Sequence, residues 1–309
     1  MGKLAVLFPG QGSQYVGMAK DIAGNSTRAK ELLELSEKIL GYDISGIMFE
    51  GPEEKLQQTQ ITQPAIFIHS SIIWNFVQEN LDAEGFAGHS LGEYTAVMAG
   101  GALSFEEALT LVKERGEAMA EAGKIQPGTM AAVIGLEENK VEEICEIASA
   151  TGTVTPANFN SPGQIVISGS VEGVNKAVEL SKKAGAKLAK LLPVSGAFHS
   201  PLMKSAQQKL TEALDAVNMQ DTAVPVYANV TAHPVNSGIE IKELLKKQLF
   251  SPVRWEETIR NMISDGFTEF IEIGPGKVLQ GLVKRIDRSV NISGMDKFED
   301  IEKFKNVIS

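Results

Sequence analysis

The sequence predicts an α/β protein in which a parallel sheet, covered by helices on both faces, is interrupted by a smaller unit. Three observations carry this prediction. Apolar runs rich in β-type residues alternate with helical patterns in the early and late parts of the chain, which is typical of a parallel sheet. Between them lies a β-α-β-β-α-β pattern. The segment Gly88 to Gly92 fits Gly-x-Ser-x-Gly, a sharp strand-to-helix turn.

The early part of the chain opens with a short apolar strand followed by a glycine-rich turn. The turn does not fit a dinucleotide loop, because Tyr15 stands where the third glycine would be. Ser104 and Glu107 form a capping box and therefore begin a helix. We expect strands at 3–8 and 86–87, and helices at 27–40, 63–80 (opened by Gln63-Pro64), 91–98 and 104–122.

The middle of the chain is predicted to be an inserted ferredoxin-like small domain. Its strands are expected at 129–134, 154–159, 164–168 and 187–192, and its helices at 138–148 and 171–184. We therefore expect a discontinuous large domain of residues 1–126 and 195–309, with residues 127–194 as the small domain. The late part should hold strands at 224–229 and 268–273, and helices at 201–217, 239–249, 255–264 and 278–286.

Composition excludes several classes of protein. The chain has 309 residues, 43% of them hydrophobic and 22% charged, as in ordinary globular proteins. The net charge of −10 argues against nonspecific nucleic-acid binding. No apolar run is long enough for a membrane span, and the start of the chain does not resemble a signal peptide. With one cysteine, Cys145, expected to be a buried structural thiol, no internal disulfide forms, and we expect a cytoplasmic protein.

Ser90, at the centre of the Gly-x-Ser-x-Gly segment, is the candidate nucleophile. It would lie at a helix N-terminus, where free N–H groups hold developing negative charge. A serine needs a base, and His199 is the best candidate because its loop lies between the small and large domains. We expect His89 and His69 to be packed and His233 to be solvated. No histidine has metal-ligand spacing, so no metal site is expected.

Arg115 lies in the middle of an apolar helix face. A buried arginine cannot lose its charge and must find an anion. Two interpretations stay open from the pattern: a structural ion pair, or a pocket residue that binds a carboxylate or phosphate. The order Ser90 then His199 matches α/β-hydrolases, yet their acid is not evident. Residues 91–198 contain no aspartate, and the glutamates lie mostly on helix faces.

Six segments together resemble the malonyl-CoA:acyl carrier protein transacylase family, and the resemblance covers nearly the whole chain. The segments are LFPGQGSQ, GHSLGEY, ERGEAM, GAFHS, KQLFSPVRW and EIGPGKVLQGL. The resemblance implies a hydrolase-like large domain with an inserted ferredoxin-like small domain. It also implies that Ser90 attacks a malonyl thioester with His199 as general base. The backbone carbonyl of Gln248 would orient His199, and the N–H groups of Gln11 and Leu91 would form the oxyanion hole.

The same resemblance resolves the role of Arg115 as the residue that binds the malonyl carboxylate. Phe198 resembles the malonyl-selective form of the family. The implied reaction uses malonyl-CoA and acyl carrier protein in fatty acid biosynthesis, needs no bound cofactor or metal, and is expected of a monomer. The carrier is acidic, so local basic patches would dock it; each is otherwise simply a solvated face. The candidates are Lys182, Lys183, Lys187 and Lys190, and a second patch of Lys284 and Arg285.

Three other functions are compatible with parts of the sequence. A free-standing malonyl acyltransferase of a polyketide synthase would use the same residues and differ in its carrier. A serine esterase or thioesterase would hydrolyse its acyl-serine rapidly and would not require Arg115. An inactive binding or scaffold protein would keep the fold, but would have no reason to retain Ser90, His199, Arg115 and Gln248 together.

Overall fold

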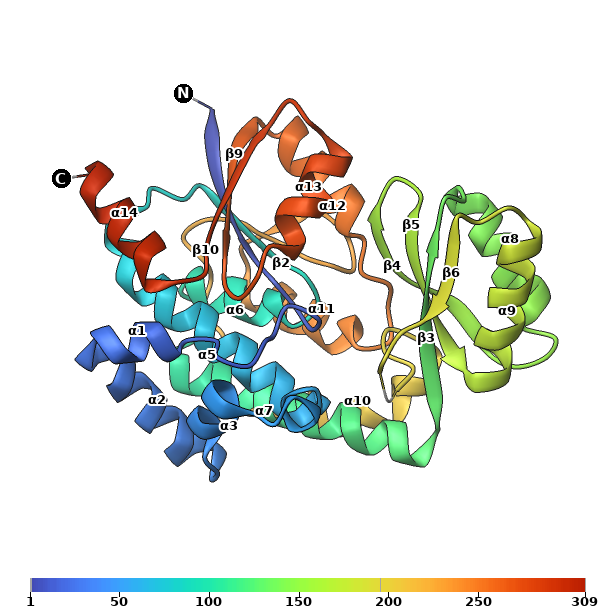
Figure 1. Ribbon diagram of the computed structural model, residues 1–309, viewed down its shortest axis with the longest axis horizontal. Coiled ribbons are helices and arrows are strands. Elements are labelled where there is room, and N and C mark those ends of the chain that lie inside the picture. The colour runs from blue at the N-terminus through green and yellow to red at the C-terminus, as the bar shows by residue number, and fades with distance from the viewer. Residues whose placement is uncertain (1, 195, 309) are drawn as a thin grey trace.

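The computed structural model describes residues 2–194 and 196–308 and contains two separate sheets (Figure 1). The strands of the larger sheet are β1 (Lys3–Phe8), β2 (Gly85–Gly88), β7 (Val226–Tyr227), β8 (Pro234–Val235), β9 (Phe267–Ile273) and β10 (Asn291–Met295). Their order is β10-β9-β1-β2-β7-β8. All neighbouring pairs are parallel except β7 and β8, so the sheet is mixed but mostly parallel.

The central strand β1 shows why a continuous apolar run forms this sheet. Val6 and Phe8 contribute to one hydrophobic core, whereas Ala5 and Leu7 contribute to the other. Because successive side chains point to opposite faces, a strand covered on both sides needs apolar residues at every position. The predicted strand at 3–8 is therefore confirmed.

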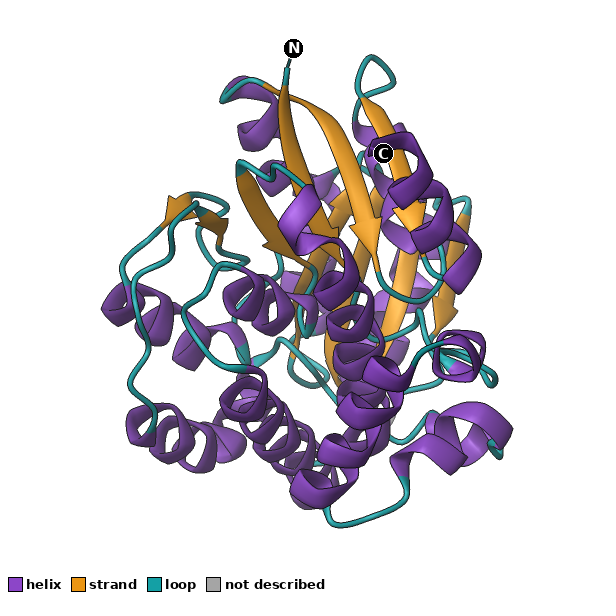
Figure 2. Cartoon of the chain, turned by 90° about the vertical axis from the view of Figure 1, so that its left-hand side faces the viewer, coloured by secondary structure: helices purple, strands orange, loops and turns teal. Residues whose placement is uncertain are grey.

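Helices cover both faces of the larger sheet, as the alternating pattern predicted (Figure 2). One core includes α5 (Thr59–Val77), α6 (Gly92–Ala99) and α7 (Phe105–Ile125), and the other includes α12 (Trp255–Ser264) and α13 (Val278–Ile286). The remaining helices are α1 (Lys20–Asn25), α2 (Thr27–Leu40), α3 (Ile44–Glu50), α4 (Glu53–Leu56), η1 (Gln78–Asn80), η2 (Pro201–Met203), α10 (Lys204–Ala216), α11 (Gly238–Gln248) and α14 (Phe298–Ile308).

The smaller sheet follows the predicted β-α-β-β-α-β order. It comprises β3 (Gly128–Ile134), α8 (Glu138–Ala148), β4 (Val154–Ser161), β5 (Gln164–Ser170), α9 (Val171–Lys183) and β6 (Leu188–Leu191). Its strands are antiparallel in the order β4-β5-β3-β6, and it has a hydrophobic core of its own, which includes Cys145. In Figure 1 this unit lies beside the larger sheet, between α7 and α10 in the chain.

Backbone hydrogen bonds from a short segment before α12 connect the two sheets. The N–H of Phe159 donates to the carbonyl of Val253 at 2.9 Å, and the N–H of Val253 donates to the carbonyl of Ala157 at 2.8 Å. This bridge ties β4 of the smaller sheet to the chain that leads into the larger one.

Two predicted elements differ most from their predicted bounds. The helix expected from Gln63 begins at Thr59, with Pro64 inside it. Proline removes one backbone donor there, and the carbonyl of Gln60 accepts from the Tyr42 hydroxyl at 3.4 Å instead. The strand expected at 224–229 is confined to β7, because the chain turns back into β8 immediately after it.

Some elements of the structure were not predicted from the sequence. Neither β10 nor α14 was predicted, and the expected domain boundary at Ser195 lies outside the described residues. In residues 2–194 and 196–308, no helix is long and apolar enough to cross a membrane. Within the same ranges, no group of three or more His, Cys, Asp or Glu side chains is arranged to hold a metal ion.

Candidate active site

The turn predicted from Gly-x-Ser-x-Gly joins β2 to α6. Ser90 has a backbone φ of +52°, which is unusual for a residue with a side chain. A Cβ atom on Gly88 would lie 1.9 Å from the backbone of Gly92, and one on Gly92 would lie 2.0 Å from the carbonyl oxygen of Phe8. Both glycines are therefore required by close packing, and the turn holds the Ser90 hydroxyl out from the backbone.

His199 lies against Ser90 from the loop that follows the smaller sheet. Its Nε2 is 2.7 Å from Ser90 Oγ. Its Nδ1 is 3.0 Å from the carbonyl oxygen of Gln248 and 3.2 Å from that of Ser251. Because a carbonyl only accepts hydrogen bonds, Nδ1 carries the proton and Nε2 is left to accept the Ser90 hydroxyl proton. The predicted pair, and the carbonyl of Gln248 behind it, are brought together.

The surroundings of His199 keep its imidazole neutral. Burial and the positive charge of Arg115 lower the pKa of His199 to about 3. A neutral imidazole at physiological pH is the form that a general base requires.

Arg115 is fully buried and also contacts Ser90. Its Nη2 donates to Ser90 Oγ at 3.1 Å and to Gln248 Oε1 at 2.9 Å, and its Nη1 donates to Gln63 Oε1 at 2.7 Å. The guanidinium lies 5.3 Å from the ring centre of Tyr94. Its Nε has no hydrogen-bond partner.

The structure gives no support to a structural ion pair at Arg115. Among the described residues, no carboxylate lies within ion-pair distance of its guanidinium. All three of its hydrogen-bond acceptors are neutral oxygens. The buried cation is thus solvated by polar groups while donors remain for an anion, which suits the binding of a carboxylate.

The candidate oxyanion donors lie on two sides of this turn. Leu91 is buried and caps the N-terminus of α6, and Gln11 belongs to the turn that follows β1. Ser13 steadies that turn by donating its hydroxyl to the carbonyl of Gly10 at 2.8 Å. Within the described part of the chain, neither the Gln11 nor the Leu91 N–H has a hydrogen-bond acceptor. Both amides therefore have a free donor to offer.

A polar network that the sequence analysis missed supports these residues. Gln248 Nε2 donates to the carbonyl of Ser90 at 2.8 Å and to Glu93 Oε2 at 2.7 Å. Asn229 Oδ1 accepts from the N–H of Ser90 at 2.7 Å, and Asn229 Nδ2 donates to the carbonyl of Gly88 at 2.7 Å. Burial raises the pKa of Glu93 to about 7.

The sequence carried a weak signal for some of these missed residues. Glu93 is the charged residue of a short, mostly apolar helix, and Gln63 is one of several polar residues in a helix without acidic or basic side chains other than His69. Both are buried, and buried polar residues require partners. Asn229 and Ser251 lie in irregular segments and gave no comparable signal.

The other histidines have the environments expected of them. His89 Nε2 is 2.8 Å from Asn160 Oδ1, and its ring packs against Trp255 at 5.5 Å between centres. His69 is fully buried, with Nε2 2.9 Å from the carbonyl oxygen of Asp296, and His233 is exposed.

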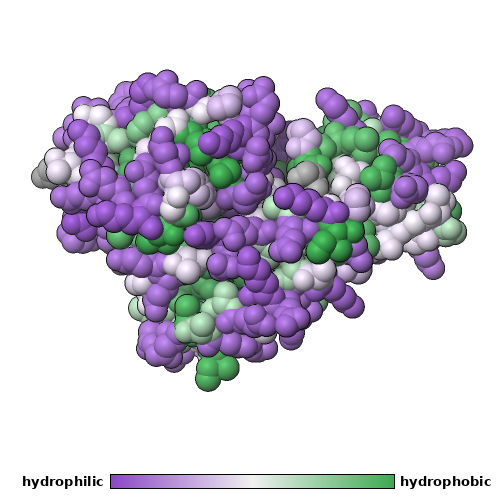
Figure 3. Space-filling model, turned by 90° about the horizontal axis from the view of Figure 1, so that it is seen from below, coloured by the Kyte–Doolittle hydropathy of each residue, from purple (hydrophilic) through white to green (hydrophobic). Residues whose placement is uncertain are grey.

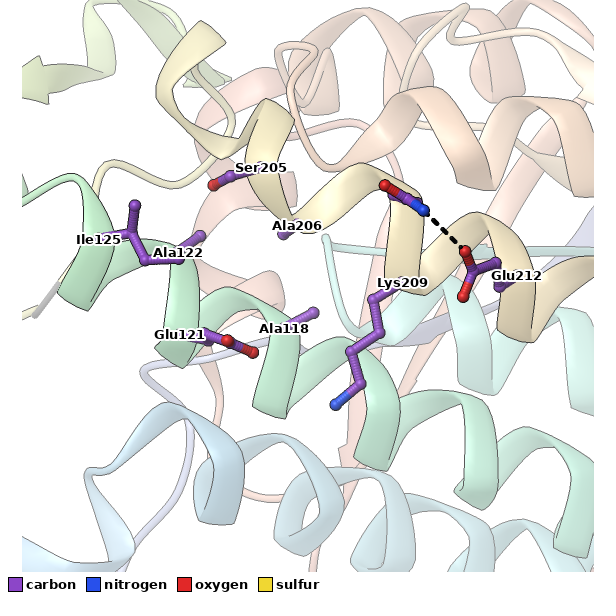
Figure 4. Close-up of a pocket in the computed structure, with 9 residues that line it drawn as sticks. Ala118, Glu121, Ala122, Ile125, Ser205, Ala206, Lys209 and Glu212 are labelled. Carbon is purple, nitrogen blue, oxygen red and sulfur yellow. Dashed lines mark hydrogen bonds between the residues drawn. The ribbon is translucent and has the colours of Figure 1, made fainter.

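A groove of about 280 Å³ lies between α7 and α10, lined by side chains such as Ala118, Ala122 and Lys209 (Figure 4). Its lining includes neither Ser90 nor His199. It is therefore not the place where the candidate nucleophile and base meet.

Comparisons with known proteins agree along nearly the whole chain. Residues 6–303 match the acyl transferase domain family. The malonyl CoA-acyl carrier protein transacylase of Bacillus subtilis is 45% identical over 304 residues, covering 98% of this chain and 96% of that protein. The transacylase of the same name from Staphylococcus aureus (strain MSSA476) is 43% identical over 303 residues, covering 98% of each chain.

Solved structures show the same relationship. The malonyl CoA-acyl carrier protein transacylase of Coxiella burnetii superposes with a TM-score of 0.95 at 40% identity, covering 99% of this chain and 98% of that one. A complex of a type II polyketide acyl-carrier protein with its malonyl-transacylase gives a TM-score of 0.93 at 38% identity, covering 97% and 98% of the two chains. The chain therefore belongs to the acyl transferase family, among the malonyl CoA-acyl carrier protein transacylases.

Proposed function

We propose that this chain is an acyl-carrier-protein S-malonyltransferase, which moves a malonyl group from malonyl-CoA to the thiol of acyl carrier protein in fatty acid synthesis. One observation carries the proposal: Ser90 Oγ lies 2.7 Å from His199 Nε2 and 3.1 Å from Arg115 Nη2. A nucleophile, its base and a cation for the substrate carboxylate meet at a single oxygen.

In the first half of the reaction, Ser90 Oγ attacks the thioester carbonyl of malonyl-CoA and its proton passes to His199 Nε2. The resulting tetrahedral intermediate collapses by breaking the carbon–sulfur bond. His199 then gives the proton to the departing sulfur, so coenzyme A leaves as a thiol and malonate remains as an ester on Ser90. The neutral imidazole of the free protein, held by the carbonyls of Gln248 and Ser251, supports this role.

The second half repeats these steps with the carrier as nucleophile. The carrier thiol gives its proton to His199 and its sulfur attacks the ester carbonyl. Collapse of the second intermediate breaks the bond to Ser90 Oγ, which recovers the proton from His199. The enzyme returns to its starting state, with no net oxidation or reduction.

Negative charge on the carbonyl oxygen in both intermediates would be held by the N–H groups of Gln11 and Leu91. Their lack of acceptors within the described residues supports this assignment, as does the position of Leu91 at the start of a helix. Losing one such donor typically costs about 3–4 kcal/mol of transition-state stabilisation.

Arg115 would select the malonyl group. Its contact with Ser90 Oγ places the guanidinium beside the acyl group that this oxygen would carry, and its burial strengthens a bond to a carboxylate. An acetyl group would leave the cation without an anion. Phe198, buried directly before His199, is proposed to keep the site in the malonyl-selective form.

We also propose that the large domain, residues 1–126 and 195–309, is hydrolase-like and that the small domain, residues 127–194, is ferredoxin-like. The smaller sheet has a core of its own and the strand order β4-β5-β3-β6, which support this division, while its other face, with Met130, Ala157 and Val166, packs into the core of the large domain. The protein would act as a monomer. A cytoplasmic location is supported by the single, buried and free thiol of Cys145.

A polyketide carrier is the second candidate acceptor, because one of the similar structures is a malonyl-transacylase in complex with a type II polyketide acyl-carrier protein. The chemistry at Ser90 would be unchanged. Comparing initial rates of malonyl transfer to a fatty acid carrier and to a polyketide carrier would distinguish the two.

Intact-mass spectrometry after brief mixing with malonyl-CoA tests the proposed function. We expect a single malonyl adduct on the parent protein, little adduct from acetyl-CoA and none on Ser90→Ala. The adduct should persist in buffer and disappear when carrier protein is added. Loss of the adduct in buffer alone would identify a thioesterase, and absence of any adduct would leave a fold without this activity.

A further inference from the structure

Glu93 is a buried carboxyl group to which the reaction assigns no step. It lies in the first turn of α6, three positions after Ser90, with 1% of its surface exposed. Its Oε2 accepts two hydrogen bonds, from Gln248 Nε2 at 2.7 Å and from the N–H of Asn229 at 3.1 Å. Among the described residues, no Lys, Arg or His lies within ion-pair distance of it.

The first of these bonds controls which way the Gln248 side chain faces. The oxygen and nitrogen of a primary amide are nearly equal in size but opposite in hydrogen bonding. Here the oxygen faces Arg115 Nη2 at 2.9 Å, and the nitrogen faces Glu93 and the carbonyl of Ser90. The reversed amide would set its NH₂ group against the guanidinium and its oxygen against two other oxygens.

The second bond reaches the Ser90 turn from another side. The backbone N–H of Asn229 donates to Glu93, while the Asn229 side chain holds the N–H of Ser90 and the carbonyl of Gly88. One carboxylate oxygen thus fixes both residues that brace the nucleophile. In its ionised form this carboxylate accepts but cannot donate, so that form tolerates a single arrangement of the two donors.

We propose that Glu93 is a positioning residue: it fixes the Gln248 amide with its oxygen toward Arg115 and so sets the direction in which the guanidinium offers its remaining donors to the substrate carboxylate. This inference rests on the proposed function. It also accounts for the acid that α/β-hydrolases place behind their histidine. In this chain a carboxyl group is present, but it acts on Arg115 and Ser90 through Gln248 and Asn229. His199 instead donates its Nδ1 proton to neutral backbone carbonyls.

The charged and titratable groups around Glu93 are consistent with this role. Burial raises the pKa of Glu93, and the positive charge of Arg115, on α7, offsets part of this rise. Tyr94, the next residue on α6, has its pKa raised to about 12 and stays neutral. His199 is neutral as well. The Gln248 amide therefore lies between the cation of Arg115 and the Glu93 carboxyl group, whose pKa of about 7 leaves it partly ionised near neutral pH.

The test is Glu93→Gln, which keeps the size of the side chain but adds a donor, so either orientation of Gln248 can be satisfied. Rates of Ser90 acylation are measured by intact mass with malonyl-CoA and with acetyl-CoA. We expect the malonyl rate to fall roughly 10- to 100-fold and the slow acetyl rate to change less than about threefold. Glu121→Gln, at an exposed glutamate of α7, is the matched control and should behave as the parent.

A double-mutant cycle with Gln248→Ala then shows whether Glu93 acts through Gln248. If it does, Glu93→Gln should have little further effect on the malonyl-to-acetyl rate ratio when Gln248 is already truncated. Independent, multiplying effects on that ratio would overturn the proposal. An unchanged ratio in Glu93→Gln with both rates reduced alike would do the same, because it would show a merely structural role.

A replacement variant and a measurement on the parent protein distinguish the remaining outcomes. If circular dichroism shows that Glu93→Gln is unfolded, Glu93→Asp takes its place. Its carboxylate is one methylene too short to reach both donors, and a parent-like ratio in that variant would contradict the proposal. Malonylation of the parent protein is measured in the same experiment. If the proposed function fails, the parent protein carries no malonyl adduct. If only this inference fails, the parent is malonylated and the variant shows the same malonyl-to-acetyl rate ratio.

Discussion

Arg115 is a cation whose hydrogen-bond partners in the site are all uncharged. Gln63, Ser90 and Gln248 each offer it one neutral oxygen, and Tyr94 offers it the face of an aromatic ring. These contacts offset part of the cost of burial and leave the positive charge in place. The arrangement is suited to a ligand that brings its own negative charge.

Replacing Arg115 by alanine should therefore remove most of the activity with malonyl-CoA. Losing one partner of a buried, hydrogen-bonded charge pair typically costs about 3–5 kcal/mol, so kcat/KM should fall by roughly 150- to 5,000-fold. Acetylation of Ser90 should be retained, so discrimination against acetyl-CoA should decrease. Arg260→Ala, at an exposed arginine paired with Glu256, is the control. Equal losses with the two thioesters would contradict the assignment.

The low pKa of His199 gives a prediction about pH. Burial lowers the pKa of its imidazole to about 3, so the base stays neutral as the pH falls through the range in which a free histidine becomes protonated, about 6.5. The inactivation rate of Ser90 by an uncharged sulfonyl fluoride, measured from pH 8 to 5 on folded protein, should not fall tenfold per pH unit. Such a fall beginning near pH 6.5 would show that His199 titrates normally.

At the scale of elements, the Ser90 turn depends on how closely α6 approaches β1. The first residue of α6 is Gly92, whose backbone lies against the carbonyl oxygens of Phe8 and Pro9. The same approach brings the turn containing Gln11 beside the start of α6. A single small residue therefore sets the relation between the two candidate oxyanion donors.

Substituting Gly92 by alanine should destabilise the protein, because the new Cβ atom would lie 2.0 Å from the carbonyl oxygen of Phe8. Overpacking of this kind costs about 1–3 kcal/mol, which thermal unfolding followed by circular dichroism would detect as a lower Tm. Gly281→Ala in α13 is the matched control, since nothing lies within 4 Å of its added Cβ atom. That helical substitution should be neutral or stabilising by up to about 1 kcal/mol; a Tm for Gly92→Ala equal to the parent's would refute the packing argument.

At the scale of the whole molecule, the site is assembled from distant parts of the chain. Ser90 comes from the turn after β2, His199 from the segment after the smaller sheet, and Gln248 from the end of α11. The bridge between Phe159 and Val253 holds the smaller sheet in place. Correct docking of the two sheets is therefore a condition for placing His199 next to Ser90.

The molecular surface bears on how a carrier would dock. The face in Figure 3 is largely hydrophilic, with hydrophobic residues in separate spots, so charge is the stronger guide to a docking surface for an acidic partner. The four candidate lysines of the small domain, Lys182, Lys183, Lys187 and Lys190, are all exposed. Lys183 pairs with Glu179, and Arg285 of the second patch donates to Gln164.

Reversing the charge of Lys182 and Lys183 together should raise the KM for the carrier several-fold and leave the KM for malonyl-CoA unchanged. The reason is that charged side chains at the edge of an interface mainly change the rate at which a charged partner associates. Steady-state kinetics at low ionic strength would measure both constants. The double reversal of Lys30 and Lys38 on α2, which are also exposed, changes the net charge equally and is the control. If both variants raise the KM equally, general charge and not this patch is responsible.

The sequence by itself determined the local elements and the nucleophile. The helices at 27–40, 138–148, 255–264 and 278–286 have the bounds that their periodicity predicted, and the Ser104 capping box is present. Apolar periodicity, caps and the Gly-x-Ser-x-Gly turn act over a few residues, so they are visible in the chain. The bounds of α5 and β7 were missed because apolar periodicity shows neither that the Gln60 carbonyl left free by Pro64 has a partner in Tyr42 nor that the chain turns back into β8 directly after β7.

Only the tertiary structure decided what surrounds the reactive groups. The pattern around Arg115 left an ion pair and an anion pocket equally open. The pattern also did not distinguish Glu93 from the other glutamates on helix faces. The partners of these two residues, Gln63, Gln248 and Asn229, lie from 52 to 155 positions away in the chain. Sequence spacing carries no information about such contacts, because burial, orientation and pKa arise only when separate elements pack together.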